Sequence, residues 1–307
     1  MTTTATSAET RPAIPTSATA PESTRRAGSY RRFARVFFSR PVVILGSVLL
    51  TIVVLSAVLA PWIAPYDPYA QNLSQVLQGP SFEHWLGTDT LGRDTLSRIL
   101  YGAQIALMIG IGTVAMAATI GTTLGLIAAY FGGWVFTIIM RFTDAMMAIP
   151  ALLLALVIST LLGSGLNAVL IAVGLALMPG YIRLMAGQVL SAKQNEYVTA
   201  ARSIGAGRMS VMFRHILPNC VSPLIVQVTL VIGLAILIEA TLSFLGLGIK
   251  PPTAAWGSMV NDGYRYLALY PILSLAPGLA IMLVVFAFNM VGDGVRDALD
   301  PRLRNIL

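Results

Sequence analysis

Charged residues are scarce in this sequence. Only 11% of the 307 residues are Asp, Glu, Lys or Arg, whereas soluble domains carry about 25%. Hydrophobic residues make up 56% of the chain, and the mean hydropathy is +0.78. A soluble domain of this size could not bury so much apolar surface. The composition therefore excludes that class and predicts a polytopic membrane protein.

The residues that build metal centres and disulfides are nearly absent. The one cysteine, Cys220, excludes an intrachain disulfide and a cysteine-cluster metal site. The two histidines, His84 and His215, lie far apart, which disfavours a structural zinc site. Neither lysine, Lys193 or Lys250, follows a glycine, so the chain has no G-x-x-x-x-G-K-[ST] phosphate loop. We predict no catalytic residue, metal site or cofactor site in this chain.

Positive charge is concentrated ahead of the first apolar run. The net charge is +7, and no basic stretch interleaved with aromatics follows, so nucleic acid is not a predicted partner. A basic cluster beside a membrane span is typical of contact with anionic lipid. The cluster consists of Arg25, Arg26, Arg31, Arg32, Arg35 and Arg40.

Hydropathy divides the chain into a tail and six apolar spans. Residues 1–35, rich in Thr, Ser, Ala and Pro, predict a disordered tail, and residues 36–307 a transmembrane domain. Gly132-Gly133 and residues 163–167 separate neighbouring spans, and Gly121-x-x-x-Gly125 predicts close helix packing. The predicted spans are 41–60, 103–129, 145–162, 168–184, 223–245 and 272–291.

The distribution of Lys and Arg predicts that both termini are cytoplasmic. With the N-terminus inside, the outer segments hold only Arg93, Arg98, Lys250 and Arg265. The inner segments hold the N-terminal cluster together with Arg141, Lys193, Arg202, Arg208, Arg214, Arg302 and Arg304.

The long inner loop has the pattern of a short helix between two breaks. Asn195 can cap a helix whose first turn holds Glu196, and Gly205 suits a left-handed stop. Pro218 marks a second break before the next span. The loop is either a lever for a cytosolic partner or an ordinary basic loop, and its residues alone favour the second.

The same loop, about residues 190–218, resembles the EAA signature of permease subunits in ABC importers. The shared pattern is two alanines, a glycine four residues later and a terminal Leu-Pro. Thr199 replaces the signature glutamate and His215 the usual isoleucine, while Glu196 resembles the glutamate of the peptide-importer branch. The resemblance implies an ATPase-coupling loop formed by Glu196, Tyr197, Ala200, Ala201, Arg202, Gly205, Ala206, Leu217 and Pro218.

Three further stretches resemble the dipeptide, oligopeptide and nickel importer family. Residues 84–98 are similar to its GTD-x-LGRD-x-LSR motif, and residues 239–257 and 287–302 are similar to its later segments. The resemblance covers about residues 35–305 in collinear order and is greatest to C-type dipeptide permeases.

The first of these stretches lies in a predicted outer segment. Gly87 and Gly92 predict turns, and Arg93 and Arg98 are expected to pair with nearby carboxylates. A calcium loop would need Glu where Leu100 stands. The stretch has either a packing role, which we favour, or a role in contacting a substrate-delivery protein. The candidate contacts are Asp89, Arg93, Asp94 and Trp256.

Glu239 lies inside a predicted span. A carboxylate there costs at least a few kcal/mol and usually faces protein or water. Glu239, with Ser243 one turn later, either lines a translocation path or fixes helix packing through a hydrogen bond. The residues leave both interpretations open.

The resemblance implies an all-α fold of six transmembrane helices with the type I ABC importer (MetI-like) architecture. It implies a non-catalytic subunit of the bacterial cytoplasmic membrane that moves dipeptides or short oligopeptides by alternating access. The implied partners are a homologous sister permease, two ATPase subunits that use ATP and Mg, an extracytoplasmic binding protein and the lipid bilayer. The alternatives are a nickel or other small-solute permease and a standalone secondary carrier.

Overall fold

The computed structural model describes residues 33–299, which are helical with no strand. The predicted disordered tail lies almost entirely outside the described residues, as do Arg302 and Arg304. Five helices are long and apolar enough to cross a membrane. They are α2 (Pro41–Ile63), α3 (Thr95–Phe131), α6 (Leu166–Ala192), α9 (Val221–Phe244) and α11 (Ile272–Leu299).

A sixth crossing is available only as a broken one. Helices α4 (Gly133–Met147) and α5 (Ala151–Leu162) pass the length and hydropathy test together, but they are bent by 93° where they meet. The sequence predicts one straight span over 145–162, and the structure differs because Pro150 interrupts it. Proline has no N–H to donate and disfavours helix in the residue before it, so α4 stops and α5 starts anew.

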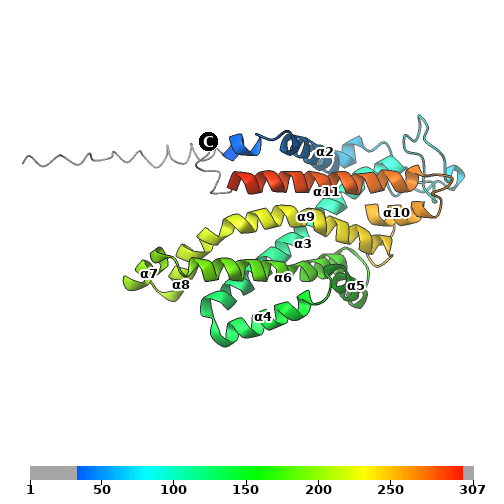
Figure 1. Ribbon diagram of the computed structural model, residues 1–307. Coiled ribbons are helices and arrows are strands. Elements are labelled where there is room, and N and C mark those ends of the chain that lie inside the picture. The colour runs from blue at the N-terminus through cyan, green and yellow to red at the C-terminus, as the bar shows by residue number, and fades with distance from the viewer. Residues whose placement is uncertain (1–32, 300–307) are drawn as a thin grey trace, which may run out of the picture.

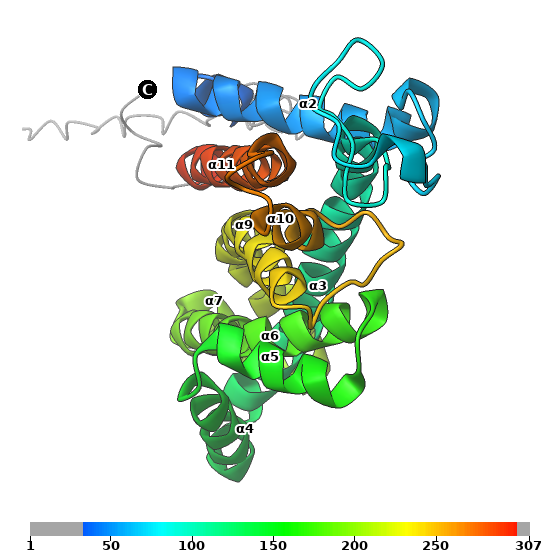
Figure 2. The same ribbon diagram turned by 90° about the vertical axis from the view of Figure 1, so that its right-hand side faces the viewer.

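The helices lie in an order that both views show. α2 is at one edge, followed by α11, then α9 with the short α10 (Trp256–Tyr264), then α6 with α5, and α4 lies farthest from α2 (Figures 1 and 2). α3 runs obliquely through this stack and packs most extensively against α6.

Glycines explain the close approach of α3 and α6. A Cβ on Gly121 or Gly125 would collide with the backbone of α6 at Met178 and Ile182. The predicted close packing at this G-x-x-x-G pair is therefore confirmed. This close approach lets α3 and α6 pack against each other more extensively than any other pair of helices in the described residues.

The two ends of the bundle differ in what they carry. The α7 end holds α7 (Glu196–Ser203) and α8 (Arg208–Ser210), and both limits of the described chain lie there (Figure 1). The α10 end holds α10 and the long segment between α2 and α3, which includes η1 (Leu73–Gln75). The α9 helix spans the distance between these ends, preceded by η2 (Val211–Ile216) and η3 (Leu217–Cys220).

Candidate coupling loop and outer polar network

Helix α7 begins where the sequence predicts it. Asn195 is the N-cap residue, but its side chain makes no capping hydrogen bond. Its backbone carbonyl oxygen accepts from the Val198 N–H at 3.1 Å. Glu196 lies in the first turn and Arg202 in the last. Each charge thus lies at the end of the helix dipole that it stabilises.

Helix α7 is stopped by Gly205, and the N–H groups of two residues after the helix donate to carbonyls of its last turn. Gly205 has φ +83°, as its predicted left-handed role requires. Its N–H donates to the Arg202 carbonyl at 3.0 Å, and the Ala206 N–H donates to the Ala201 carbonyl at 3.1 Å. This pair of bonds is the Schellman motif, which satisfies the last carbonyls of the helix. The motif therefore fixes where the chain leaves α7.

Helix α7 has a buried side and an exposed side. Val198 is buried in a cluster with Tyr130 of α3, Val189 of α6 and Val211 of η2, and Ala201 is also buried. Beside the buried residues, Tyr197 is 38% and Ile204 86% exposed, and Ala200 is also exposed. Exposed apolar side chains grouped outside a membrane span are typical of a surface that contacts another protein. Ile204 was not singled out from the sequence, although its spacing of seven from Tyr197 places both on one face.

After a turn at residues 204–207, the chain from α7 to α9 is helical without being regular. Residues 211–216 form a π turn, residues 217–220 a 3₁₀ turn, and α9 follows directly at Val221. Leu217 packs against the same cluster as Val198, and Pro218 lies exposed inside the 3₁₀ turn. Residues 208–244 form one apolar helical stretch, so only the four residues of that turn separate α7 from an element long enough to span a membrane.

At the α10 end, Asp89 is the centre of a network of hydrogen bonds and ion pairs. One carboxylate oxygen accepts from the N–H groups of Leu91 and Arg93 at 2.9 and 3.0 Å. The other pairs with the Arg93 Nε at 2.6 Å and lies 3.5 Å from the Arg98 Nε. Both arginines are buried, and the predicted pairing of these residues is confirmed. Paired guanidinium groups of this kind are held in fixed geometry.

Asp94 forms a second buried group on the same segment. Its carboxylate lies 2.9 Å from the Nδ1 of His84 and accepts from the N–H and Oγ of Ser97 at 2.8 and 2.7 Å. Asp94 is therefore the N-cap of α3, joined to a histidine ten residues earlier. Gly87 and Gly92, with φ +74° and +72°, form the predicted turns around it.

The segment between α2 and α3 and the segment that leads into α10 are fastened to each other. The Arg98 Nη1 donates to the carbonyl of Pro68 at 3.1 Å and to that of Pro252 at 3.4 Å. The Trp256 Nε1 donates to the Ile99 carbonyl at 3.0 Å. Trp256, Arg93 and Asp94 are buried, which favours the packing interpretation over direct contact with another protein.

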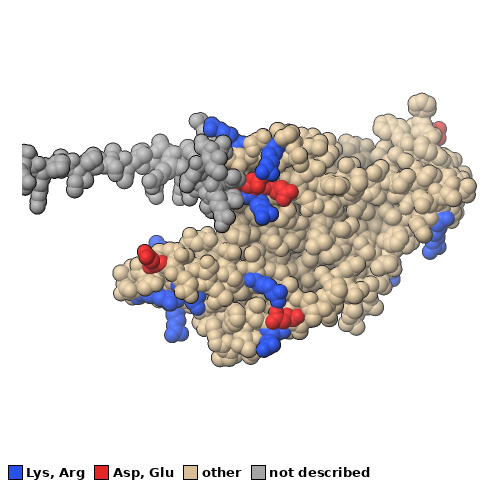
Figure 3. Space-filling model, viewed as in Figure 1, with Lys and Arg blue, Asp and Glu red and all other residues tan. Residues whose placement is uncertain are grey.

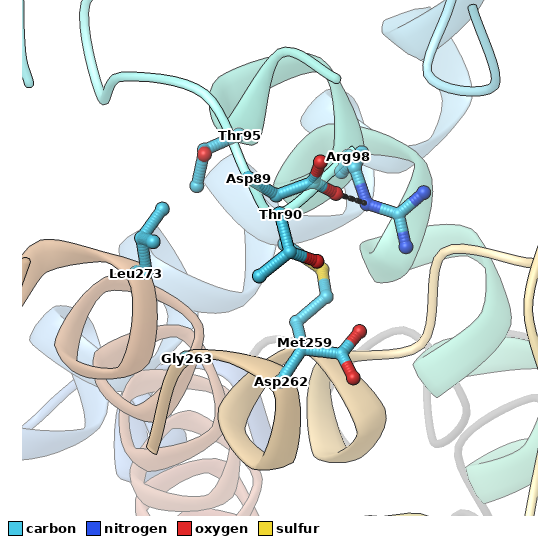
Figure 4. Close-up of a pocket in the computed structure, with 8 residues that line it drawn as sticks. All are labelled: Asp89, Thr90, Thr95, Arg98, Met259, Asp262, Gly263 and Leu273. Carbon is cyan, nitrogen blue, oxygen red and sulfur yellow. Dashed lines mark ion pairs between the residues drawn. The ribbon is translucent and has the colours of Figure 1, made fainter. Parts of the chain in front are cut away.

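A small pocket lies beside this network (Figure 4). Asp89 and Arg98 face it from one side and Asp262 of α10 from another, and the Thr95 Oγ1 has no hydrogen-bond partner within residues 33–299. Burial raises the pKa of Asp262, and the charges of Arg93 and Arg98 oppose that rise. The cavity is about 10 Å³, room for about one water molecule, so it is not a substrate site.

Glu239 and Ser243 are joined by a buried hydrogen bond at the α10 end of α9. Glu239 is 2% exposed, and its Oε1 accepts from the Ser243 Oγ at 2.7 Å. That same Oγ accepts from the Ile249 N–H at 3.0 Å, which holds the loop after α9. The arrangement favours the packing interpretation of Glu239 over a lining of a translocation path.

Comparisons with known proteins cover nearly the whole chain. Residues 121–305 match the family described as "Binding-protein-dependent transport system inner membrane component", and residues 29–80 match the "N-terminal TM domain of oligopeptide transport permease C". The chain is 43% identical over 279 residues to the glutathione transport system permease protein GsiD of Pectobacterium atrosepticum, covering 90% of this chain and 92% of the relative. It is 45% identical over 262 residues to the dipeptide transport system permease protein DppC of Alkalihalophilus pseudofirmus, covering 85% and 86%. It is 44% identical over 278 residues to GsiD of Escherichia coli O157:H7, covering 90% and 91%.

Proposed function

The chain belongs to the family of binding-protein-dependent inner membrane components of ABC importers, and from that premise we propose that α7 transmits the action of partner ATPases to α9. Members of this family are non-catalytic membrane subunits. The observation that carries the proposal is the division of α7 into a buried face and an exposed apolar face.

Two features support transmission through α7. Val198 packs α7 into the cluster formed by the ends of α3 and α6 and by η2, so a force applied to the exposed side of α7 is passed to the bundle. After the short turn at residues 204–207, the helical stretch 208–244 continues into α9. A movement of α7 is therefore passed to a membrane-spanning helix through that turn and through the contacts of α7 with η2.

We assign the partners from the arrangement of the ends. One chain carries one α7, so two ATPases, which use ATP and Mg, require a second, homologous permease. The α7 end then faces the cytoplasm with both termini, and the α10 end faces an extracytoplasmic binding protein. This orientation agrees with the excess of Lys and Arg in the inner segments.

The proposed cargo is a short peptide. The relatives include permeases named for dipeptide and glutathione transport, and both cargoes are short peptides. Translocation would proceed by alternating access in the cytoplasmic membrane, with the path formed between this chain and its sister permease.

Substitutions on the exposed face of α7 test the proposal. In the reconstituted complex, Ile204→Asp should lower ATP-dependent dipeptide uptake about tenfold or more, because it places a charge at the centre of an apolar contact. Ser210→Asp, which adds the same charge to exposed α8, is the matched control. Ala201→Asp is less informative, since Ala201 is buried and the variant would disturb folding.

The amounts of inserted permease and of bound ATPase are measured alongside uptake. The expected result is normal insertion of Ile204→Asp, weakened retention of the ATPases and normal behaviour of Ser210→Asp. Full uptake and full ATPase retention in Ile204→Asp would show that α7 is not the docking element.

A further inference from the structure

Two pockets meet at the α7 end, and they have different linings. The first, about 430 Å³, is lined by the cations Lys193, Arg202 and Arg208 together with Tyr130 and Phe131. Basic side chains are visible over this end of the molecule in Figure 3. Its volume lies in the range of small-molecule sites. The three cations give this pocket the positive charge of an anion-binding site.

The cations of this first pocket have no acidic partner in the part of the chain that the structure describes. Within residues 33–299, none of its three cations forms an ion pair. The Lys193 Nζ donates to the carbonyls of Ala129 and Tyr130 at 3.0 and 3.1 Å, which holds the ammonium at the end of α3. Burial and the charge of Arg202 lower the pKa of Lys193. An anion bound among these groups would relieve that repulsion.

The second pocket is an apolar groove of about 250 Å³. It runs between the end of α3, at Leu126 and Ile127, and the segment after α7, at Met209 and Met212. Phe131 lines both pockets, so they are continuous at that side chain. Phe131 and Met209 are exposed, so the groove is open to the surface.

One short segment supplies both linings. Arg208 faces the basic pocket, and the next residue, Met209, faces the apolar groove. On the α3 side, Tyr130 and Phe131 form an aromatic border at the level where the two meet. Aromatic rings in membrane proteins concentrate at the headgroup level, with apolar surface on one side and polar surface on the other.

We propose that the joined pockets bind one anionic phospholipid, with its phosphate among Lys193, Arg202 and Arg208 and an acyl chain in the apolar groove. An acidic protein segment or a free phosphate would satisfy the charge and leave the groove unfilled. Basic pockets between transmembrane helices on the cytoplasmic side are suited to anionic lipid headgroups. The choice of leaflet rests on the orientation given under the proposed function; the binding itself does not.

The test is lipid retention by the purified full complex, measured by native mass spectrometry after delipidation and titration with phosphatidylglycerol. Arg208→Gln should weaken binding about fivefold, the effect expected for about 1 kcal/mol per basic residue near an anionic surface. Arg202→Gln should weaken it to a similar degree. Arg214→Gln, an exposed arginine in the same loop that lines neither pocket, is the matched control and should bind normally.

A second variant tests the groove without changing charge. Thr123→Trp should fill the groove and reduce phosphatidylglycerol binding while leaving inorganic phosphate unaffected. Thr160→Trp is its control, because Thr160 is also an exposed helical threonine whose hydroxyl donates to the carbonyl four residues earlier. Normal lipid binding in Thr123→Trp would show that no acyl chain occupies the apolar groove.

Three results would overturn the assignment. Equal binding of phosphatidylglycerol and phosphatidylcholine would show that the basic pocket does not select an anion. Binding of inorganic phosphate as tight as that of phosphatidylglycerol would identify a free anion as the ligand. Loss of lipid whenever the ATPases are bound would identify an acidic segment of that partner as the occupant.

Discussion

At the α10 end, connecting segments are held by buried ions, whereas at the α7 end a short helix is held by small apolar side chains. Asp89 and Asp94 together bind two arginines, a histidine and backbone N–H groups. Val198 makes no such directional bond and fastens α7 by apolar packing. Directional buried networks have one satisfied geometry, while apolar contacts tolerate displacement. The difference suits a fixed α10 end and, under the proposed function, an α7 end that is moved by a partner.

The largest expected effect comes from removing a centre of the outer network. Asp94→Ala leaves the His84 ring and the first turn of α3 without their acceptor. Breaking a buried charged group of this kind costs about 3–5 kcal/mol, so we expect a large loss of thermal stability in detergent. Asp67→Ala, an exposed acid in the same segment, is the control. Equal losses in both variants would mean that the network does not stabilise this end.

A pair of glycines compares the two ends directly. Both Gly92 and Gly205 have positive φ, so an added Cβ costs about 1–2 kcal/mol at either position. At Gly92 the Cβ would also collide with the backbone of Asn72, whereas at Gly205 it meets no atom within 4 Å. Thermal unfolding should therefore show a much larger loss for Gly92→Ala than for Gly205→Ala. A reversed order would contradict the rigid-outer-end interpretation.

Variants of Glu239 distinguish a role in packing the α10 end from a role in transport. Glu239→Gln keeps the Oε1 that accepts from Ser243, so uptake and assembly should stay near those of the unsubstituted complex. Glu239→Ala removes the acceptor and should cost about 1–3 kcal/mol of stability. Loss of uptake in Glu239→Gln with normal assembly would instead place the carboxylate on the translocation path.

The smallest expected effect is a change in pH dependence at Asp262. Its pKa is raised in the folded state by burial, so the folded chain binds a proton more tightly than the unfolded chain does. This contribution favours folding at acidic pH and is lost as the pH rises through the folded pKa. Asp262→Asn should flatten that part of the stability profile. An unchanged slope in unfolding measurements between acidic and neutral pH would refute the assignment.

Local signals in the sequence predicted much of this arrangement. The stop at Gly205, the turns at Gly87 and Gly92 and the pairing of Arg93 with Asp89 all depend on neighbouring residues. Hydropathy alone missed the break at Pro150, because apolar residues continue on both sides of it. The contact from Trp256 to Ile99 joins residues 157 positions apart, and no local pattern encodes it.

The candidate coupling loop shows the same division. Its helix and its boundaries were predictable, but which of its residues point outward was not. Ala201 was grouped with the docking residues and is buried, while Ile204 was passed over and is the most exposed apolar residue of the loop. The orientation of α7 depends on its packing against the end of α3, which lies more than sixty residues away in sequence, as well as on the neighbouring α6 and η2.

The π turn at residues 211–216 has a consequence for which side chains the segment between α8 and α9 can present. A π turn accommodates one residue more than a regular α turn. If that extra residue migrates along the chain, every residue that it passes shifts register by one position. Each residue that is passed rotates by about 100° and shifts by about 1.5 Å, while the helices on either side keep their places. The segment can therefore exchange the side chains on its surface in discrete steps without displacing α9.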